Sequence, residues 1–148
     1  MSIPAQLVED LVAIKQWAQR APTVEAAEVD TALLIIGDGV NVIATGIIGA
    51  WGFDFRARIT GWWIQEFEGT AGSISITLAK APRGPSPAFA SIVGSAPPAI
   101  SGARYAESSV LTGWTDQINR NDIIRVQVTS VATFKRILLG LRVRRLEP

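Results

Sequence analysis

Few side chains in this sequence are of the types that carry out reactions. The 148 residues include no histidine and no cysteine, which removes the usual base for a serine nucleophile, thiolate chemistry and cysteine-based zinc sites. A serine would need Lys80 or Lys135 as its base, so we interpret the serines as structural. Two carboxylates such as Asp54 and Glu66 could serve a glycosidase, but most acids lie in predicted turns or beside arginines. We therefore expect a protein without enzymatic activity, cofactor or metal.

A glycine-rich segment at residues 37–41, with the sequence GDGVN, loosely resembles a phosphate-binding or calcium-binding loop. It lacks the lysine of a phosphate loop and the oxygen-ligand spacing of a calcium loop. A tight turn in which the glycines adopt positive φ angles explains the same residues better. We expect a turn between strands here and no ligand.

Five tryptophans give the sequence another way to bind a ligand. Their faces could stack on sugar rings, although tryptophan in a small β domain lies more often in the core or at a subunit interface. Trp62 and Trp63 are adjacent in a predicted strand, so their side chains must point to opposite faces. We select Trp51, Trp62 and Trp63 as candidate surface-binding residues, and we expect Trp114 to pack beneath its turn.

The composition favours a globular protein that is partly covered by partners. Hydrophobic residues make up 48% of the chain, charged residues only 18%, and the mean hydropathy is +0.27, so a small monomer would expose much apolar surface. The net charge of +1 is uneven, because residues 1–30 carry five acids and two bases. The basic last strand has no interleaved aromatics, so we expect no nucleic-acid binding. Polar residues interrupt the apolar stretch 33–50, and residues 1–4 do not begin a secretory signal, so we expect neither membrane insertion nor export.

An amphipathic helix is predicted for residues 1–22. Its stripe residues recur at spacings of four and three, with Trp17 widening the stripe: Leu7, Leu11, Ile14, Trp17 and Ala18. Pro22 ends the pattern, and the helix is about 25 Å long, too short to be stable alone. We expect these residues to oligomerise as a trimeric stalk or to anchor the chain on another protein, while packing against the chain's own domain stays an alternative. Residues 23–30 are predicted to be a linker.

The remainder, residues 31–148, predicts a mainly β domain. Alternating apolar and polar residues predict strands at residues 31–36, 40–45, 53–64, 73–78, 105–111, 122–129 and 133–145. A proline-rich loop covers residues 81–98, with one turn of helix expected near 89–93. Roughly eight short strands separated by turn signals are typical of an antiparallel β-sandwich of jelly-roll type.

A series of short motifs in the β portion carries a family resemblance. The motifs are, in order, Asp38-Gly39-Val40, Phe53 to Ile59 with Gly61-Trp62, Gly72-Ser73-Ile74, Pro97-Pro98, Gly113-Trp114-Thr115, Asp122-Ile123 and a closing strand from Leu139 to Val143. Together, over residues 31–145, they resemble a domain of bacteriophage tail-fibre and related virion proteins. The chain departs from the family pattern at two places, Thr77-Leu78 and Asn121. The family has glycine at the position of Asn121, but asparagine also tolerates the left-handed conformation.

This resemblance implies a non-enzymatic structural protein of the virion, assembled in the host cytoplasm. It would be a tail-fibre, tail-tip, head-fibre or capsid-decoration subunit, commonly a homotrimer, which joins other virion proteins through the N-terminal helix and contacts a host surface glycan. The alternative interpretation is a stand-alone carbohydrate-binding β-sandwich module, in which the tryptophans would be the binding residues.

Overall fold

A computed structural model describes residues 29–146 of the chain. The predicted helix at 1–22, with Leu7, Leu11, Ile14, Trp17 and Ala18, lies outside the described residues, as does most of the predicted linker. Within residues 29–146 every regular element is a β-strand. The described part also contains no helix that is long and apolar enough to span a membrane.

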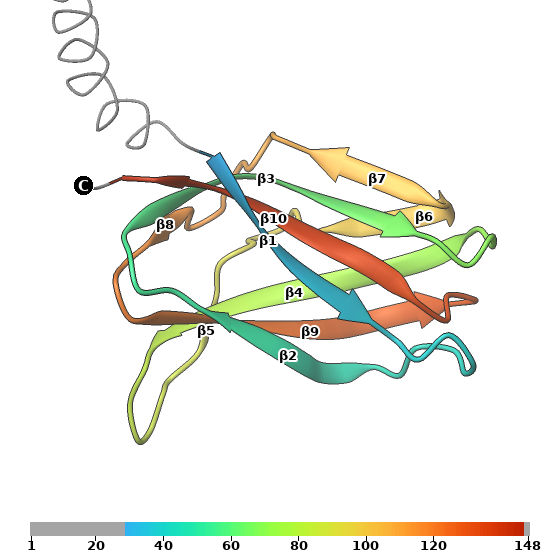
Figure 1. The fold of residues 1–148 in the computed structure, drawn as a ribbon, viewed down its shortest axis with the longest axis horizontal. Coiled ribbons are helices and arrows are strands. Elements are labelled where there is room, and N and C mark those ends of the chain that lie inside the picture. Colours follow the sequence, from blue (N-terminus) through green and yellow to red (C-terminus); the bar gives the residue numbers. More distant parts are fainter. Residues whose placement is uncertain (1–28, 147–148) are drawn as a thin grey trace, which may run out of the picture.

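Ten antiparallel strands form two sheets (Figure 1). They are β1 (Val29–Ile36), β2 (Gly46–Gly52), β3 (Ala57–Glu66), β4 (Gly72–Pro82), β5 (Ala90–Ser91), β6 (Ala99–Ala103), β7 (Tyr105–Ser108), β8 (Gln117–Ile118), β9 (Asp122–Ala132) and β10 (Ile137–Arg145). The first sheet has the order β1-β10-β3-β7, with β8 also paired to β3. The second has the order β2-β9-β4-β5, with β6 also paired to β4. The chain enters β1 and leaves β10 at the same end of the molecule, where Val29 pairs with Arg144.

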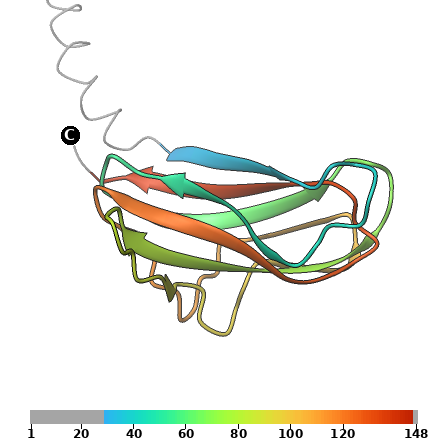
Figure 2. The same cartoon turned by 90° about the horizontal axis from the view of Figure 1, so that it is seen from below.

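The two sheets lie face to face and share one hydrophobic core. Figure 2 shows the layers edge-on, with β1 and β10 in one and β9 in the other. The core combines fully buried side chains of the first sheet, such as Ile64 and Leu139, with those of the second, such as Ile76 and Val126. Alternate residues of each strand point inward, and burying each such side chain contributes roughly 1.5–3 kcal/mol. The mainly β architecture of antiparallel strands in two sheets is therefore confirmed.

Several details predicted from the sequence are also confirmed. The inward faces of β4, β9 and β10 are those that the alternation indicated. Gly37 and Gly39 have φ angles of 100° and 80°, as expected of a tight turn. Asn121 adopts a φ of 74°. Trp114 is buried, and its Nε1 donates a hydrogen bond to the carbonyl of Ala96 at 2.9 Å, so it anchors the turn before β8.

The strand predicted at residues 40–45 is wrong, because this segment is a loop and the strand β2 begins only at Gly46. The carboxylate of Asp38 accepts hydrogen bonds from the amides of Val40 and Asn41, at 2.8 and 2.9 Å. The amide of Ile43 donates to the carbonyl of Phe134 at 2.9 Å. These bonds occupy the backbone groups that a strand ladder would have used.

Other boundaries also differ from the sequence prediction. The helical turn expected near 89–93 is wrong, since Ala90 and Ser91 form β5 and pair with β4. The strand predicted from residue 53 begins at Ala57, and the one predicted from residue 133 begins at Ile137. Thr133 has a φ of 78°, which turns the chain between β9 and β10 and which a β-branched residue adopts only under constraint.

We predict that Thr133→Gly stabilises the protein by about 1 kcal/mol, because glycine adopts a positive φ without the steric cost that a β-carbon imposes. Chemical denaturation of the native and variant proteins measures this. Thr77→Gly, in the middle of β4, is the matched control and should destabilise by about 1 kcal/mol. An unchanged or lower unfolding midpoint for Thr133→Gly would contradict the prediction.

Candidate assembly and binding surface

The outer faces of the two sheets differ in chemistry. The second sheet exposes polar side chains between its buried residues: Ser73, Ser75, Thr77, Gln127 and Thr129. The corresponding positions of the first sheet include polar side chains such as Gln65, Glu107 and Arg142, but also a group of apolar and aromatic ones: Leu33, Ile35, Trp63, Tyr105 and Leu138. A sheet face that meets water is normally polar, so the outer face of the first sheet is unusual.

The strand register places these residues in two adjacent rows. One row runs Leu33, Gly140, Trp63, Glu107 across β1, β10, β3 and β7. The next runs Ile35, Leu138, Gln65, Tyr105 across the same strands. Residues that pair directly point to the same side of a sheet. The β1 half of this face is therefore aliphatic, whereas the β3–β7 half combines aromatic and polar groups.

An apolar edge continues the aliphatic half around the side of the sandwich. We give this name to Leu33, Ile35, Val40, Val42 and Ile47, each of which is more than half exposed. They come from β1, the following loop and β2, and β1 and β2 are the end strands of their sheets. Trp51 lies at this edge, half-buried, and its Nε1 donates to the carbonyl of Leu33 at 3.1 Å. Trp51 therefore links the two sheets and donates a hydrogen bond to a carbonyl of the edge strand β1.

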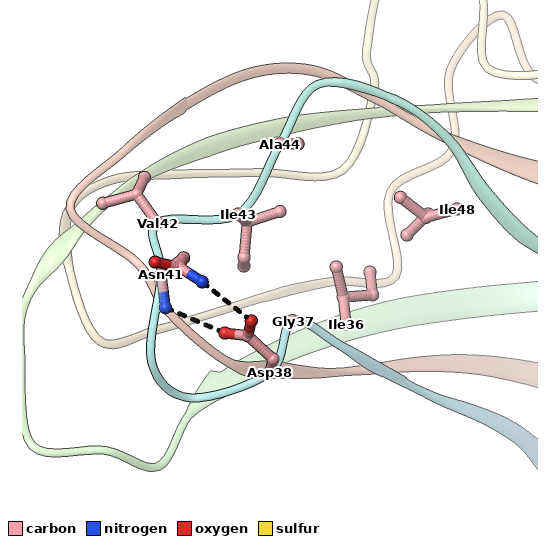
Figure 3. A pocket seen from close by; sticks show the side chains of 8 residues that line it. All are labelled: Ile36, Gly37, Asp38, Asn41, Val42, Ile43, Ala44 and Ile48. Carbon is pink, nitrogen blue, oxygen red and sulfur yellow. Dashed lines mark hydrogen bonds between the residues drawn. The ribbon is translucent and has the colours of Figure 1, made fainter.

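A hollow of about 360 Å³ opens beside the apolar edge (Figure 3). Its walls are mainly aliphatic, with Asp38 and Asn41 at one end; the lining residues are Ile36, Gly37, Asp38, Asn41, Val42, Ile43, Ala44 and Ile48. The loop around it is held by the carboxylate of Asp38, which accepts hydrogen bonds from two backbone amides, and by Arg136, whose guanidinium donates to the carbonyl of Asp38 at 2.7 Å. The hollow is thus a preformed concave extension of the apolar edge.

A polar cluster lies next to Trp63 on the other half of the face. Glu107 accepts hydrogen bonds at the same oxygen, Oε2, from the hydroxyl of Tyr105 at 2.7 Å and from Arg142 at 2.9 Å. The bond from Tyr105 and the one from Arg142 hold the pKa of Glu107 below its usual value. The same hydrogen bond to Glu107 raises the pKa of Tyr105. At neutral pH this cluster therefore presents an ionised carboxylate fixed in place by two neighbours.

The structure separates the three tryptophans selected from the sequence. Trp62 is 7% exposed and belongs to the core, which corrects its assignment to a binding surface: in the alternation of β3 it takes an inward position. Trp51 closes the edge between β1 and β2. Trp63 alone of the three stands on an outer sheet face. The cluster of Tyr105, Glu107 and Arg142 was not predicted, because β-pairing brings Arg142 to the other two from a distant part of the sequence.

The carboxylates considered for catalysis have structural partners. Asp54 forms an exposed ion pair with Arg83 at 2.8 Å. Glu66 is 1% exposed and pairs with Arg104 at 2.7 Å. It also accepts hydrogen bonds from the amides of Glu68 and Thr70. The two carboxylates are thus not presented together in a cleft, and among residues 29–146 no group of three histidine, cysteine or acidic side chains is placed to hold a metal.

Glu66 and Arg104 form a clamp between two turns at one end of the sandwich. Glu66 ends β3, and the amide of Glu66 donates to the carbonyl of Arg104 at 2.8 Å, at the junction of β6 and β7. Burial raises the pKa of the Glu66 carboxyl, but the bonds from Arg104 and from the amides of Glu68 and Thr70 lower it by more. The net pKa lies below the usual value of glutamate, so the clamp is ionised at neutral pH.

Comparisons with known proteins add no argument about function. No family model and no curated protein sequence matches this chain. A solved structure described as "Structure of infectious bursal disease virus Gx strain" is similar at 12% sequence identity, with a TM-score of 0.19. The match covers 83% of this chain and 40% of that one. At such a TM-score the similarity supports no inference about the fold or the role of this protein.

We predict that the Glu66–Arg104 clamp makes stability depend on pH. Because the folded-state pKa of Glu66 is depressed, its contribution is complete above the unfolded-state value, about 4.3, and is lost as the pH falls through the lower folded-state pKa. The free energy of unfolding, measured by denaturation between neutral and acidic pH, should fall in this range, and Glu66→Gln should flatten the dependence. An unchanged slope in this variant would contradict the assignment.

Removing the arginine gives a second test of the clamp. Arg104→Ala should destabilise the protein by about 2 kcal/mol at neutral pH, because it leaves a buried carboxylate without its cation, although water partly replaces the half-exposed arginine. Asp54→Asn breaks an exposed ion pair and is the control, with an expected change below about 0.5 kcal/mol. Equal effects of the two variants in urea denaturation would refute a special role for the buried pair.

Proposed function

We propose that this protein is a non-enzymatic structural component of a bacteriophage virion, which assembles as a homo-oligomer on the particle. The single observation that carries the assembly part is the apolar edge on β1, the following loop and β2. Five of the ten exposed large hydrophobic side chains of the described residues fall within positions 33–47. Exposed apolar side chains gathered along one edge in this way mark a contact with another protein.

The open edge of the first sheet supports the same proposal. β1 pairs with β10 on one side only, and it carries the sequence VDTALLII, with one acid, no lysine and no proline. Proteins that stay monomeric usually protect such an edge with charges, prolines or bulges. Here Trp51 protects the edge at one position only, the carbonyl of Leu33. The side chains of Leu33 and Ile35 therefore stay available to contact a neighbouring copy of the chain.

The order of the strands supports a jelly roll, the architecture that we propose for the sandwich. β5 and β6 both pair with β4, and β7 and β8 both pair with β3, so each of these two sets can be counted as one interrupted strand. The resulting eight strands are ordered 1-8-3-6 in the first sheet and 2-7-4-5 in the second. This order is that of two interlocked Greek keys, which is the jelly roll of many capsid and lectin domains.

The virion part of the proposal depends on the sequence resemblance. The resembling motifs include Gly113-Trp114-Thr115 and Asp122-Ile123, and both have clear structural roles. Trp114 anchors its turn in the core, while the buried carboxylate of Asp122 accepts the amide of Asn119 at 2.7 Å. The proposed particle positions are tail fibre, tail tip, head fibre or capsid decoration. The stripe of Leu7, Leu11, Ile14, Trp17 and Ala18 would hold a homotrimer together or anchor it on the particle.

A stand-alone carbohydrate-binding module is the second candidate, and the half-buried position of Trp63 on an outer sheet face beside a polar cluster favours it. The two candidates differ in oligomeric state. A monomeric mass together with sugar binding would favour the module, whereas an oligomer that is found on purified particles would favour the virion protein.

We predict that the native chain is an oligomer in solution and that Ile35→Asp converts it to smaller species, because a charge would be buried at the contact between copies. Sedimentation velocity or mass photometry measures this. Thr77→Asp, on the polar outer face of the second sheet, is the control and should leave the mass unchanged. A native monomer would refute the assembly part of the proposal, as would an Ile35→Asp protein of native mass.

The sequence-based role of the N-terminal stripe has its own test. Leu11→Asp should abolish oligomerisation or attachment to particles, because it places a charge in the centre of the apolar stripe. Immunogold labelling of purified particles, together with the solution mass, separates the two roles. An unaffected mass combined with unaffected labelling would contradict both.

A further inference from the structure

We propose that the outer face of the first sheet around Trp63 is a carbohydrate-binding site, which stacks the apolar face of a pyranose ring on the indole and binds its hydroxyls through Glu107 and Arg142. The inference deepens the proposed function, and its role at a host surface rests on that function. The site lies on β3, β7 and β10.

The indole of Trp63 is placed for stacking because the residue beside it is a glycine. Gly140 pairs directly with Trp63. A β-carbon added at Gly140 would lie 2.2 Å from Cε2 of the indole, 2.5 Å from Nε1 and 2.6 Å from Cζ2. Cε2 joins the two rings, so an approach closest to this atom comes from the face of the indole and not from its edge. One face of Trp63 therefore covers the glycine of β10, which leaves the opposite face as the one that a sugar ring would stack on.

Hydrogen-bonding groups lie on the strands that flank Trp63. Glu107 is the direct partner of Trp63 on β7, and paired residues on adjacent strands are about 4.8 Å apart. Tyr105 and Arg142 both donate to Oε2 of Glu107, so neither bond uses Oε1. That oxygen can accept from a sugar hydroxyl, while the remaining guanidinium donors of Arg142 can bind a neighbouring hydroxyl oxygen.

The cluster is arranged before a ligand arrives. Two donors fix the carboxylate of Glu107, and the ring of Trp63 rests against backbone. Side chains that are held in this way lose little conformational freedom on binding, which favours affinity. A depressed pKa keeps Glu107 an acceptor at neutral pH.

The chemistry around Trp63 favours a sugar over a protein partner. Residues that dominate protein interfaces are enclosed by groups that exclude water, and the aliphatic half of this face, with Leu33 and Ile35, has that character. Trp63 lies at the boundary, with Glu107, Arg142 and Gln65 beside it on β7, β10 and β3. An aromatic face bordered by charged and amide groups matches a pyranose, which presents C–H groups on its faces and hydroxyls around its rim.

Oligomerisation would raise the apparent affinity of this site for a surface that carries many sugars. A single sheet-face site of this size binds weakly, whereas several sites on one particle act together through a high effective concentration. The apolar edge and the site share the row Leu33, Gly140, Trp63, Glu107. Joining copies through the β1 half would therefore leave the β3–β7 half open and repeat it around the assembly.

The test uses the full chain and a panel of methyl glycosides of glucose, galactose, mannose and N-acetylglucosamine, followed by saturation-transfer NMR. We expect at least one glycoside to bind, and Trp63→Ala to weaken that binding by about tenfold or more. Gly140→Ala should do the same, because its β-carbon displaces the indole. Trp51→Phe, which changes a tryptophan away from the site, should bind as the native protein does, and thermal unfolding checks that each variant is folded.

Several outcomes would overturn the inference. These are no binding by any glycoside of the panel, binding that survives both Trp63→Ala and Gly140→Ala, and a Trp63→Ala protein whose oligomeric mass changes while its sugar binding does not. The last result would make this face an interface between copies. A native oligomer that binds no sugar refutes only this inference, whereas a monomer that binds sugar through Trp63 refutes only the assembly part of the proposed function.

Discussion

The structure depends on one constraint: both sheets bury one face in the same core, so every long strand must alternate between an inward and an outward residue. Ile74, Ile76 and Leu78 satisfy it in β4, and Ile137, Leu139 and Leu141 satisfy it in β10. A one-residue shift of either strand would exchange the buried set for the exposed one. The core therefore fixes the register, and the register in turn decides which side chains meet on the outside.

A few polar groups complete the fold where the strands end. The Glu66–Arg104 pair joins the turn after β3 to the β6–β7 junction. At the opposite end of β3, the Asp122 carboxylate accepts an amide and lies 3.5 Å from Lys80. These buried acids satisfy backbone and cationic groups that would otherwise be desolvated without partners. This explains why a chain with little charge keeps carboxylates inside.

The proposed assembly surface and the proposed sugar site are consequences of the same row across the first sheet. Leu33, Gly140, Trp63 and Glu107 occupy equivalent outward positions on four neighbouring strands. Their chemistry changes from aliphatic through a bare backbone and an aromatic ring to a charged group. A glycine in this row is essential to the arrangement, since any side chain at Gly140 would compete with the indole for space.

The sequence by itself determined that side chains alternate between two faces along each strand, and which face of the long strands points inward. It also determined the turn at Gly37 to Gly39 and the positive φ of Asn121. These features are local, because they follow from side-chain alternation and from the conformations that single residues tolerate. The loop at residues 40–45 was mispredicted as a strand, because Asp38 and the distant carbonyl of Phe134 take its backbone hydrogen bonds.

Only the tertiary structure decided which tryptophan faces water and what surrounds it. Trp62 and Trp63 are equivalent in the sequence, and the packing of β3 between β10 and β7 buried the first and left the second half-buried on the outer face. The cluster of Tyr105, Glu107 and Arg142 depends on pairs between β3 and β7 and between β3 and β10. Such pairs join residues far apart in the chain, and no spacing in the sequence specifies which strands become neighbours.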